Sequence, residues 1–332
     1  MTSMTSQGPL VVVGDVLLDI DIEGRADRRS PDGDVPVVDV ATRTLRPGGA
    51  GLAAALAGQD VADVVLIGGF AADSSGDRLR ALLPERIRVL SLPFRGTTVR
   101  KERIRAMGPC AGSEDRPATI TRLDFGDGGV TADPLRDDVR EAIDTARAVL
   151  VADYGRGAAT HPQVRTLLEA RAGQIPLVWD PHPRGPVPIR DATLATPNRD
   201  EAQRFVPGTR GPRRAARTLT ERWSAQAVAV TLGADGAMLF CRGRPDVLHI
   251  PTPSGLLMSP GSDTCGAGDR FAAAAISALA DGADVEKAVQ LAVAAATEFV
   301  NSGAASALGF PQDHAPVAPR DPGISDAAAE RR

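Results

Sequence analysis

The chain has 332 residues, of which 43% are hydrophobic and 24% are charged, and its formal net charge is -4. This composition is typical of a globular protein with a substantial core, and it does not favour a disordered chain or a nucleic-acid partner. The three cysteines and four histidines are scattered, which argues against a disulfide framework or a histidine-based metal site. Because the sequence shows neither a signal peptide nor an apolar run of membrane-spanning length, we expect a cytoplasmic protein without a membrane partner.

The first part of the chain predicts strands and helices that do not alternate regularly. An apolar run at 10–13 predicts a buried strand that ends at Gly14-Asp15, and a glycine-rich turn at 47–51 precedes a small-residue helix. The other elements expected here are strands at 35–40, 64–68, 89–92, 97–104 and 118–125 and a helix at 75–83. The strands at about 35–40 and 97–125 interrupt the β–α order, so we expect them to form a small β-sheet that acts as a lid.

From about residue 134 onward, helices and strands alternate. The expected helices are 134–146, 163–172, 213–223, 269–280 and 284–300, and the expected strands are 148–152, 177–179, 193–195, 227–231, 236–241 and 247–250. This order predicts an α/β fold with a mostly parallel, doubly wound sheet. We expect one domain over residues 10–310, with flexible tails at 1–9 and 311–332.

Polar or small residues follow several of the predicted strands. They are Asp15, Asp153, Asp180, Asn198 and Gly233. Ligands on doubly wound sheets bind at the carboxyl ends of the strands. The sequence therefore predicts a ligand site along this edge.

The most informative segment runs from Asp263 to Asp269 and reads Asp-Thr-Cys-Gly-Ala-Gly-Asp. Its small residues allow backbone N–H groups to approach an anion, and the helix that follows adds the positive end of its dipole. Asp269 stands beside this anion site, an arrangement that suits phosphoryl transfer to a hydroxyl. A simple helix cap after a glycine turn is the alternative.

Other motifs precede this segment in a fixed order. They are Gly14-Asp15-x-x-x-Asp19, Pro47-Gly48-Gly49-Ala50, Asp153-Tyr154-Gly155-Arg156-Gly157, Asp180-Pro181, Asn198-x-x-Glu201 and Thr231-Leu232-Gly233-x-x-Gly236. Neither the P-loop nor the Rossmann glycine fingerprint occurs, which disfavours P-loop phosphotransferases and nicotinamide-dependent oxidoreductases.

The ordered set resembles the ribokinase-like (PfkB) family of carbohydrate kinases over roughly residues 10–310. Within that family the chain most resembles the bacterial D-glycero-D-manno-heptose 7-phosphate kinases. The residues that carry this narrower resemblance are Arg29-Ser30-Pro31, Val35-Pro36-Val37-Val38, Lys101-x-Arg103, Arg122-Leu123-Asp124-Phe125 and the Asp153-Tyr154-Gly155-Arg156-Gly157 segment. The resemblance implies a ribokinase-like fold with a small β-sheet lid.

The resemblance also implies roles for individual residues in catalysis. Asp269 would be the general base, and the backbone of Gly266, Ala267 and Gly268 would hold the transferring phosphoryl group. Asn198 and Glu201 would organise Mg²⁺ through water, and Asp263 would lie near a site for a monovalent cation such as K⁺. The residues implied to lie along ATP are Thr231, Gly233 and Gly236, besides Asn198 and Glu201.

A sugar or sugar phosphate is the implied acceptor. The residues expected to bind it are Asp19, Gly48, Gly49, Lys101, Arg103, Arg122, Asp153 and Arg156. Strand alternation would aim Lys101, Arg103 and Arg105 at one face, where they could bind a phosphate. A solvated basic edge is the alternative for these cations.

Several of these residues also have purely structural interpretations. Asn198 could be a turn residue or a helix cap, and Glu201 could stabilise the first turn of that helix. Asp19 could be a solvated carboxylate. The pair Arg122 and Asp124 could be a surface ion pair that contributes little.

Three positions depart from the family pattern. The family usually has Asn shortly after Gly48-Gly49, where this chain has Leu52 and small residues. The Asp-Pro-Lys of heptose kinases is Asp180-Pro181-His182, and Arg270 follows Asp269 in place of Thr or a small residue. Since leucine cannot bind a hydroxyl by a hydrogen bond, these departures predict an altered sugar pocket.

The function expected from the resemblance is ATP-dependent phosphorylation of a sugar or sugar phosphate, such as a heptose 7-phosphate at O1 or a related sugar of a specialised pathway. The alternative is a non-catalytic descendant that binds a sugar or nucleotide. A lid with exposed sheet edges further predicts a homodimer.

Overall fold

The computed structural model describes residues 8–256 and 263–314. Within these residues the chain divides into two compact units, one formed by residues 8–19, 46–101 and 124–310 and the other by residues 20–45, 102–123 and 311–314. The first unit contains the predicted ligand-binding edge of the large sheet. Among the described residues, no helix has both the length and the apolar character needed to cross a bilayer.

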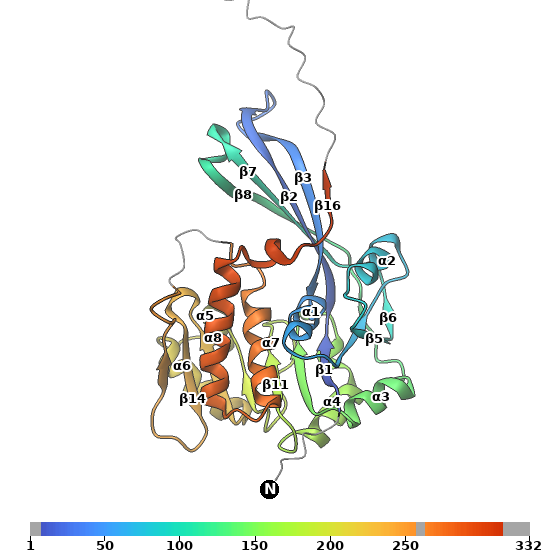
Figure 1. Cartoon of the computed structure of the whole chain (residues 1–332), viewed down its shortest axis with the longest axis vertical. Helices are drawn as coiled ribbons and strands as arrows, with labels where there is room; N and C mark the ends of the chain where they lie inside the picture. The colour runs from blue at the N-terminus through green and yellow to red at the C-terminus, as the bar shows by residue number, and fades with distance from the viewer. Residues whose placement is uncertain (1–7, 257–262, 315–332) are drawn as a thin grey trace, which may run out of the picture. The chain divides into compact units, whose positions relative to one another are not determined.

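A nine-stranded sheet forms the centre of the first unit (Figure 1). Its strands, in spatial order, are β15 (Leu248–Ile250), β14 (Ala237–Cys241), β13 (Ala227–Thr231), β12 (Leu194–Ala195), β11 (Leu177–Asp180), β10 (Ala148–Ala152), β1 (Leu10–Gly14), β4 (Val64–Gly69) and β5 (Arg88–Leu92). The strands from β13 to β5 are parallel, whereas β14 pairs antiparallel with both of its neighbours, β13 and β15. The mostly parallel, doubly wound sheet expected from the sequence is confirmed.

Helices accompany this sheet in the alternating order of a doubly wound fold. They are α1 (Ala50–Asp60), α2 (Ser74–Ala81), α3 (Asp137–Asp144), α4 (Pro162–Arg171), α5 (Arg199–Phe205), α6 (Pro212–Trp223), α7 (Ala267–Ala280) and α8 (Val285–Asn301). Short 3₁₀ turns occur at Pro109–Ala111, Ala158–Thr160, Gly233–Asp235 and Ala304–Leu308. Helix α7 packs against α1 and α8, while α3, α4 and α6 contribute to one hydrophobic core with alternate strand residues.

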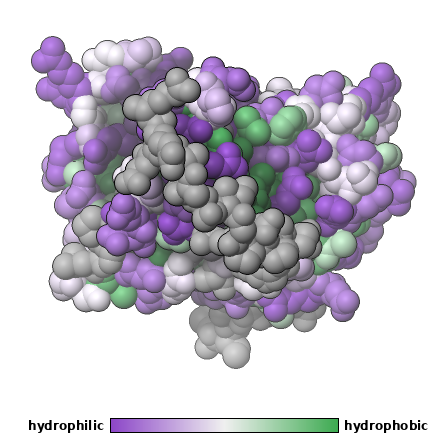
Figure 2. Space-filling view, turned by 90° about the horizontal axis from the view of Figure 1, so that it is seen from above, coloured by the Kyte–Doolittle hydropathy of each residue, from purple (hydrophilic) through white to green (hydrophobic). Residues whose placement is uncertain are grey.

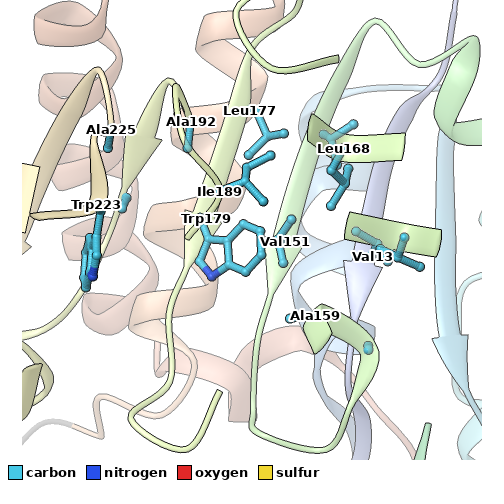
Figure 3. Close-up of a cluster of buried hydrophobic side chains, with 14 of the residues drawn as sticks. Val13, Val151, Ala159, Leu168, Leu177, Trp179, Ile189, Ala192, Trp223 and Ala225 are labelled. Carbon is cyan, nitrogen blue, oxygen red and sulfur yellow. The ribbon is translucent and has the colours of Figure 1, made fainter. Parts of the chain in front are cut away.

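Trp179 of β11 is the largest fully buried side chain of that core. Figure 3 shows its ring beside Val151 and Ile189, with Leu177 further along the same strand. The successive residues of β1 point to opposite faces of the sheet, and Val11 and Val13 join this core. Because β1 is buried on both faces, it reads as a continuous apolar run, which explains why the sequence identified it.

A second sheet of five strands has the order β16 (Gln312–His314), β3 (Pro36–Gly49), β2 (Val16–Arg29), β7 (Arg100–Gly108) and β8 (Ser113–Phe125). A further pair joins β6 (Phe94–Arg95) to β9 (Gly129–Val130). The small sheet expected from the sequence is therefore present. Its strands are longer than expected, and β2 was missed, although Leu18 to Glu23 alternates apolar and acidic residues.

Two local expectations were wrong. Residues 47–49 are the end of β3 and not a turn, because the strand runs directly into α1 at Ala50. Residues 312–314, expected in a flexible tail, pair with Thr42 to Thr44 of β3. The rest of that tail, and residues 1–7, lie outside the described residues.

Candidate active site

Asp269 lies in the first turn of α7, directly after the glycine-rich turn. Gly266 has a φ of 82°, and a Cβ at this position would lie 2.7 Å from Leu52, so that the turn needs glycine for two reasons. The N–H of Ala267 donates to the carbonyl of Thr264 (3.1 Å). The following N–H groups belong to the first turn of a helix, where no carbonyl within the helix can accept from them. An anion placed here would meet these donors and the positive end of the helix dipole.

A cavity of about 180 Å³ lies beside this turn, and we call it the acidic cavity. Its lining residues are Asp153, Tyr154, Asp180, Pro181, His182, Thr196, Asn198, Glu201, Thr231, Gly266, Gly268 and Asp269. These residues come from the ends of β10, β11, β12 and β13, from the loops that follow them and from the starts of α5 and α7. The structure thus brings together the predicted residues at the carboxyl ends of these neighbouring strands.

Burial in this cavity disfavours the ionised forms of its carboxyl groups. Burial raises the pKa of Asp269 to about 7 and that of Asp153 also to about 7. Burial, followed by the nearby charges of Glu201 and Asp269, raises the pKa of Asp180 well above its usual value. Burial likewise raises the pKa of Glu201. A bound cation would stabilise the ionised forms of all four groups.

This donor set fits a divalent cation that arrives with a nucleotide. Among the described residues, no group of three or more histidine, cysteine or acidic side chains lies close enough to hold a metal ion by itself. Mg²⁺ keeps several waters and shares its ligands between one or two carboxylates and phosphate oxygens. A cavity with separate carboxyl groups, such as Glu201 and Asp180, suits this mode of binding.

The pair Asn198 and Glu201 forms a capping box at the start of α5. The Asn198 side chain accepts hydrogen bonds from the N–H groups of Asp200 (3.0 Å) and Glu201 (2.9 Å). Glu201 in turn accepts one from the N–H of Asn198 (2.9 Å). The structural interpretation of both residues is therefore shown, and their predicted role in organising Mg²⁺ remains a prediction.

A second cavity of about 160 Å³ adjoins the first, since Thr231 and Gly268 line both. We call it the apolar cavity, because α7 and α8 supply mainly apolar side chains to it. Its residues are Thr231, Gly233, Gly236, Thr264, Ala267, Gly268, Phe271, Val293, Ala296, Thr297 and Val300. A flat apolar ligand with polar substituents fits such a lining. The predicted ATP residues Thr231, Gly233 and Gly236 thus lie together at this cavity.

Asp19 forms a buried ion pair with Arg46, with 3.8 Å between Oδ2 and Nη2. Arg46 is fully buried, and its Nη2 also donates to the Sγ of Cys265 (3.1 Å) in the turn before α7. A Cβ on Gly48 would collide with Asp19, so glycine permits the close approach of β3 to this carboxylate. The alternative of a solvated Asp19 is therefore wrong, because its side chain is buried.

Asp15 holds the loop after β10 and has no place in either cavity. Its carboxylate accepts hydrogen bonds from the N–H groups of Tyr154 (2.9 Å), Arg156 (2.8 Å) and Ala158 (2.9 Å). This loop carries Asp153 and Tyr154 into the acidic cavity. Asp15 is therefore a structural support of the site.

The predicted cations at the lid strands separate into different environments. Lys101 places its Nζ 4.6 Å from the ring centroid of Tyr154, within the first unit. Arg103 and Arg105 belong to the second unit, where they pair with Asp21 (3.4 Å) and Glu23 (3.1 Å) of β2. Arg122 is exposed on β8 in the same unit. Lys101 thus lies in the same unit as Asp269 and close to Tyr154. The other three cations, Arg103, Arg105 and Arg122, belong to the second unit.

The three departures from the family pattern receive structural explanations. Leu52 is buried under the Gly266 turn. Arg270 turns away from the cavity and forms a paired contact with Asp60 at the end of α1 (2.6 and 3.1 Å). His182 remains in the acidic cavity, where it stacks on Tyr154 with 6.4 Å between the ring centroids. The departure at Arg270 therefore concerns helix packing, whereas His182 changes the cavity itself.

Two residues that line the acidic cavity with defined partners were not predicted from the sequence. Tyr154 donates its hydroxyl to Oδ1 of Asp269 (2.8 Å), and Thr196 donates to Oδ1 of Asp180 (2.8 Å). Tyr154 is the only tyrosine in the chain and stands within a recognised motif, which was the available signal. Asp263, the predicted neighbour of a monovalent cation, accepts from the N–H of Cys265 (2.9 Å) and borders residues 257–262, which lie outside the described residues.

Comparisons with known proteins agree with this geometry. The model of the pfkB family carbohydrate kinases matches residues 166–312. The bifunctional protein HldE of Streptomyces coelicolor is 46% identical over 315 residues, covering 93% of this chain and 63% of that protein. Its counterpart in Pseudomonas paraeruginosa is 31% identical over 312 residues, covering 92% and 63%. The chain thus spans a little less than two thirds of the length of these relatives.

The solved structures show the same fold at low sequence identity. The ribokinase of Arabidopsis thaliana, complexed with ribose and ATP, has a TM-score of 0.63 and is 20% identical, with 92% of this chain and 96% of that chain covered. Residues 166–312 are thus similar to the pfkB family of carbohydrate kinases, and the chain resembles the HldE proteins over most of its length and has a ribokinase fold.

Proposed function

We propose that the protein transfers the γ-phosphoryl group of ATP to a hydroxyl of a sugar or sugar phosphate. The observation that carries the proposal is the position of Asp269, a buried carboxyl group with a pKa of about 7, where the acidic and apolar cavities meet at the start of α7. A base with this pKa can accept a proton near neutral pH. The ATP bound by the Arabidopsis ribokinase supports the choice of donor.

In this proposal the apolar cavity takes the nucleotide, and its phosphates extend past Thr231 and Gly268 to the acidic cavity. Asp269 accepts the proton of the acceptor hydroxyl while the oxygen of that hydroxyl forms a bond to the γ-phosphorus. The bond between the γ-phosphorus and the bridging oxygen of the β-phosphate breaks, and ADP leaves. N–H groups at the start of α7 stabilise the charge on the transferred group. Mg²⁺, organised by Asn198 and Glu201, would neutralise phosphate charge when bound, and K⁺ near Asp263 is a further proposal.

The replacement Asp269→Asn tests the role of the base. Asparagine keeps the size of the side chain and cannot accept the proton, so we expect turnover to fall by at least about 100-fold, the lower end of general-base contributions. Binding of Mg–ATP, measured by calorimetry, should remain within a few-fold of the original value. A variant with nearly normal kcat would show that Asp269 is not the base.

We further propose that the acceptor carries a phosphate. It is a heptose 7-phosphate, which would be phosphorylated at O1, or a related sugar of a specialised pathway. The resemblance to the heptose 7-phosphate kinases and the position of Lys101 beside Tyr154 support this choice. A panel of hexoses, heptoses and their phosphates, each assayed for ATP turnover, identifies the acceptor. Binding of a sugar or a nucleotide without any turnover of ATP would favour the non-catalytic alternative.

Arg103→Ala tests phosphate recognition, with Arg105→Ala as the matched control. Both arginines pair with acidic residues of β2, so that each variant loses an ion pair with that strand. We expect Arg103→Ala alone to lower kcat/KM for the phosphorylated acceptor by about 10- to 100-fold, as for a lost charged hydrogen bond, and to leave the unphosphorylated one nearly unchanged. Equal losses for both acceptors, or in both variants, would contradict the proposal.

The cellular setting follows from the same chemistry. An enzyme that consumes ATP and small phosphorylated sugars requires a compartment that supplies both, and we therefore propose the cytoplasm. We also propose that the five-stranded sheet acts as the lid of the kinase domain over residues 10–310.

A further inference from the structure

The ring of Tyr154 is fixed by several segments that are far apart in the sequence. Its backbone N–H is held by Asp15 at the end of β1, and a Cβ on Gly49 would lie 3.2 Å from the ring. His182, after β11, stacks on the ring, with an angle of 21° between the two planes. The ammonium group of Lys101 lies 4.6 Å from the ring centroid. A side chain held in this way has little freedom to rotate.

The hydroxyl of this fixed ring makes one directed hydrogen bond, 2.8 Å long, to Oδ1 of Asp269. Burial, together with the charge of Asp269, raises the pKa of Tyr154 well above its usual value, so the hydroxyl stays protonated and donates a hydrogen bond to the carboxylate. Donation stabilises the ionised form of Asp269 and leaves its other oxygen, Oδ2, available on the same carboxyl group.

We propose that Tyr154 is a positioning residue for the base Asp269: it holds Oδ1, so that Oδ2 is the oxygen that takes the proton of the acceptor. This inference rests on the proposed function and deepens it, because it assigns different tasks to the two oxygens of one carboxylate. It also gives the aromatic residue of the Asp153-to-Gly157 motif a role in the reaction. Lys101 and His182 then serve the site by fixing the ring.

Four other charged groups surround Asp269 and must remain unchanged for a clean test. Asp19 raises the pKa of Asp269, and Lys101 and Arg46 lower it, while Asp180 lies near enough for its own pKa to be raised by Asp269. Tyr154→Phe keeps the ring between its neighbours and removes only the hydroxyl. It alters none of these charges.

The first measurement is the pH dependence of kcat/KM. Because the hydrogen bond stabilises the carboxylate, its loss should raise the pKa of Asp269 and move the acid limb of the profile to higher pH by about one unit. At high pH, where the base is ionised in both proteins, kcat of Tyr154→Phe should still be about tenfold lower, since Oδ1 is no longer held. A uniform loss with the acid limb in place would show a merely structural role and overturn the proposal.

The second measurement needs no turnover and uses the single tyrosine of the chain. In protein labelled with ¹³C at Cζ of tyrosine, the one NMR signal should shift with an apparent pKa near 7 as Asp269 ionises. Asp269→Asn should abolish this shift. A shift that persists in that variant would report Asp153 instead, and an absent shift in the original protein would show that the hydrogen bond does not form; either result overturns the proposal. If the shift behaves as expected and no sugar is phosphorylated, the proposed function fails and the hydrogen bond stands.

Discussion

At the scale of single residues, the site contains carboxyl groups whose burial opposes their charge. Asp153 and Asp269 share a pKa of about 7, but their partners differ. Asp269 accepts from a side chain, Tyr154, and faces the start of a helix. Asp153 accepts from the N–H of Gly155 (2.8 Å) in its own loop, and the neighbouring charge of Asp15 adds to the effect of burial. Ionised Asp153 should therefore destabilise the fold.

The replacement Asp153→Asn tests whether the ionised carboxylate destabilises the folded protein. The folded pKa of about 7 lies above the unfolded value of 3.8, so the penalty is absent below about pH 4, grows between the two values and is complete above pH 7. We expect the variant to be more stable than the original protein at pH 8, by as much as ~4 kcal/mol, and similar at pH 4. Urea unfolding at both pH values measures the difference. A gain that does not depend on pH would contradict the assigned pKa.

At the scale of elements, the start of α7 places the proposed base Asp269 next to a structural residue, Arg270. Asp269 faces the acidic cavity, while Arg270 points to Asp60 and ties α7 to the end of α1. Helical geometry separates neighbouring residues by about 100° and so sends them to different faces. An unusual residue beside the proposed base can therefore be unrelated to the reaction.

Arg270→Thr restores the small residue usual in the family. Because the ion pair is only partly exposed, its loss should lower the free energy of unfolding by about 1 kcal/mol. We expect kcat and KM to stay within about a factor of three. Asp60→Asn is the matched control, because it breaks the same contact from α1 and should give a similar loss of stability. A loss of kcat in Arg270→Thr alone would place Arg270 in the reaction.

At the scale of the whole molecule, the five-stranded sheet ends in a long edge strand, β8, whose residues are mostly exposed. Leu123 and Phe125 on this strand are large apolar residues with 40% and 41% of their surface exposed. The face visible in Figure 2 is mostly hydrophilic, with apolar residues in smaller patches between. A long edge strand with exposed apolar side chains favours association with a second copy.

We therefore expect a homodimer that forms through this sheet. Light scattering at micromolar concentration should give twice the mass of the 34.5 kDa chain. Leu123→Lys places a charge on the strand and should shift the protein toward the monomer. Leu291→Lys is the control, because Leu291 is similarly exposed on α8, at 43%, and lies in the other unit. A monomeric original protein, or equal effects of both variants, would count against this interface.

The sequence by itself determined the parts of this protein that depend on local chemistry. Apolar runs fixed the parallel strands, and the Asp263-to-Asp269 segment indicated an anion site with a carboxylate. Asp153, Asp180 and Asn198 follow their strands, so the common direction of those strands was enough to predict that they meet.

Only the tertiary structure decided which partner each group has. The hydrogen bond from Tyr154 to Asp269 joins residues 115 positions apart, and the contact of Arg270 with Asp60 spans 210. Such contacts depend on how loops and helices pack, which no local pattern encodes. The same packing turned Asp15 from a candidate ligand residue into the support of a loop, and it buried the carboxyl groups, which set their pKa values through loss of solvent.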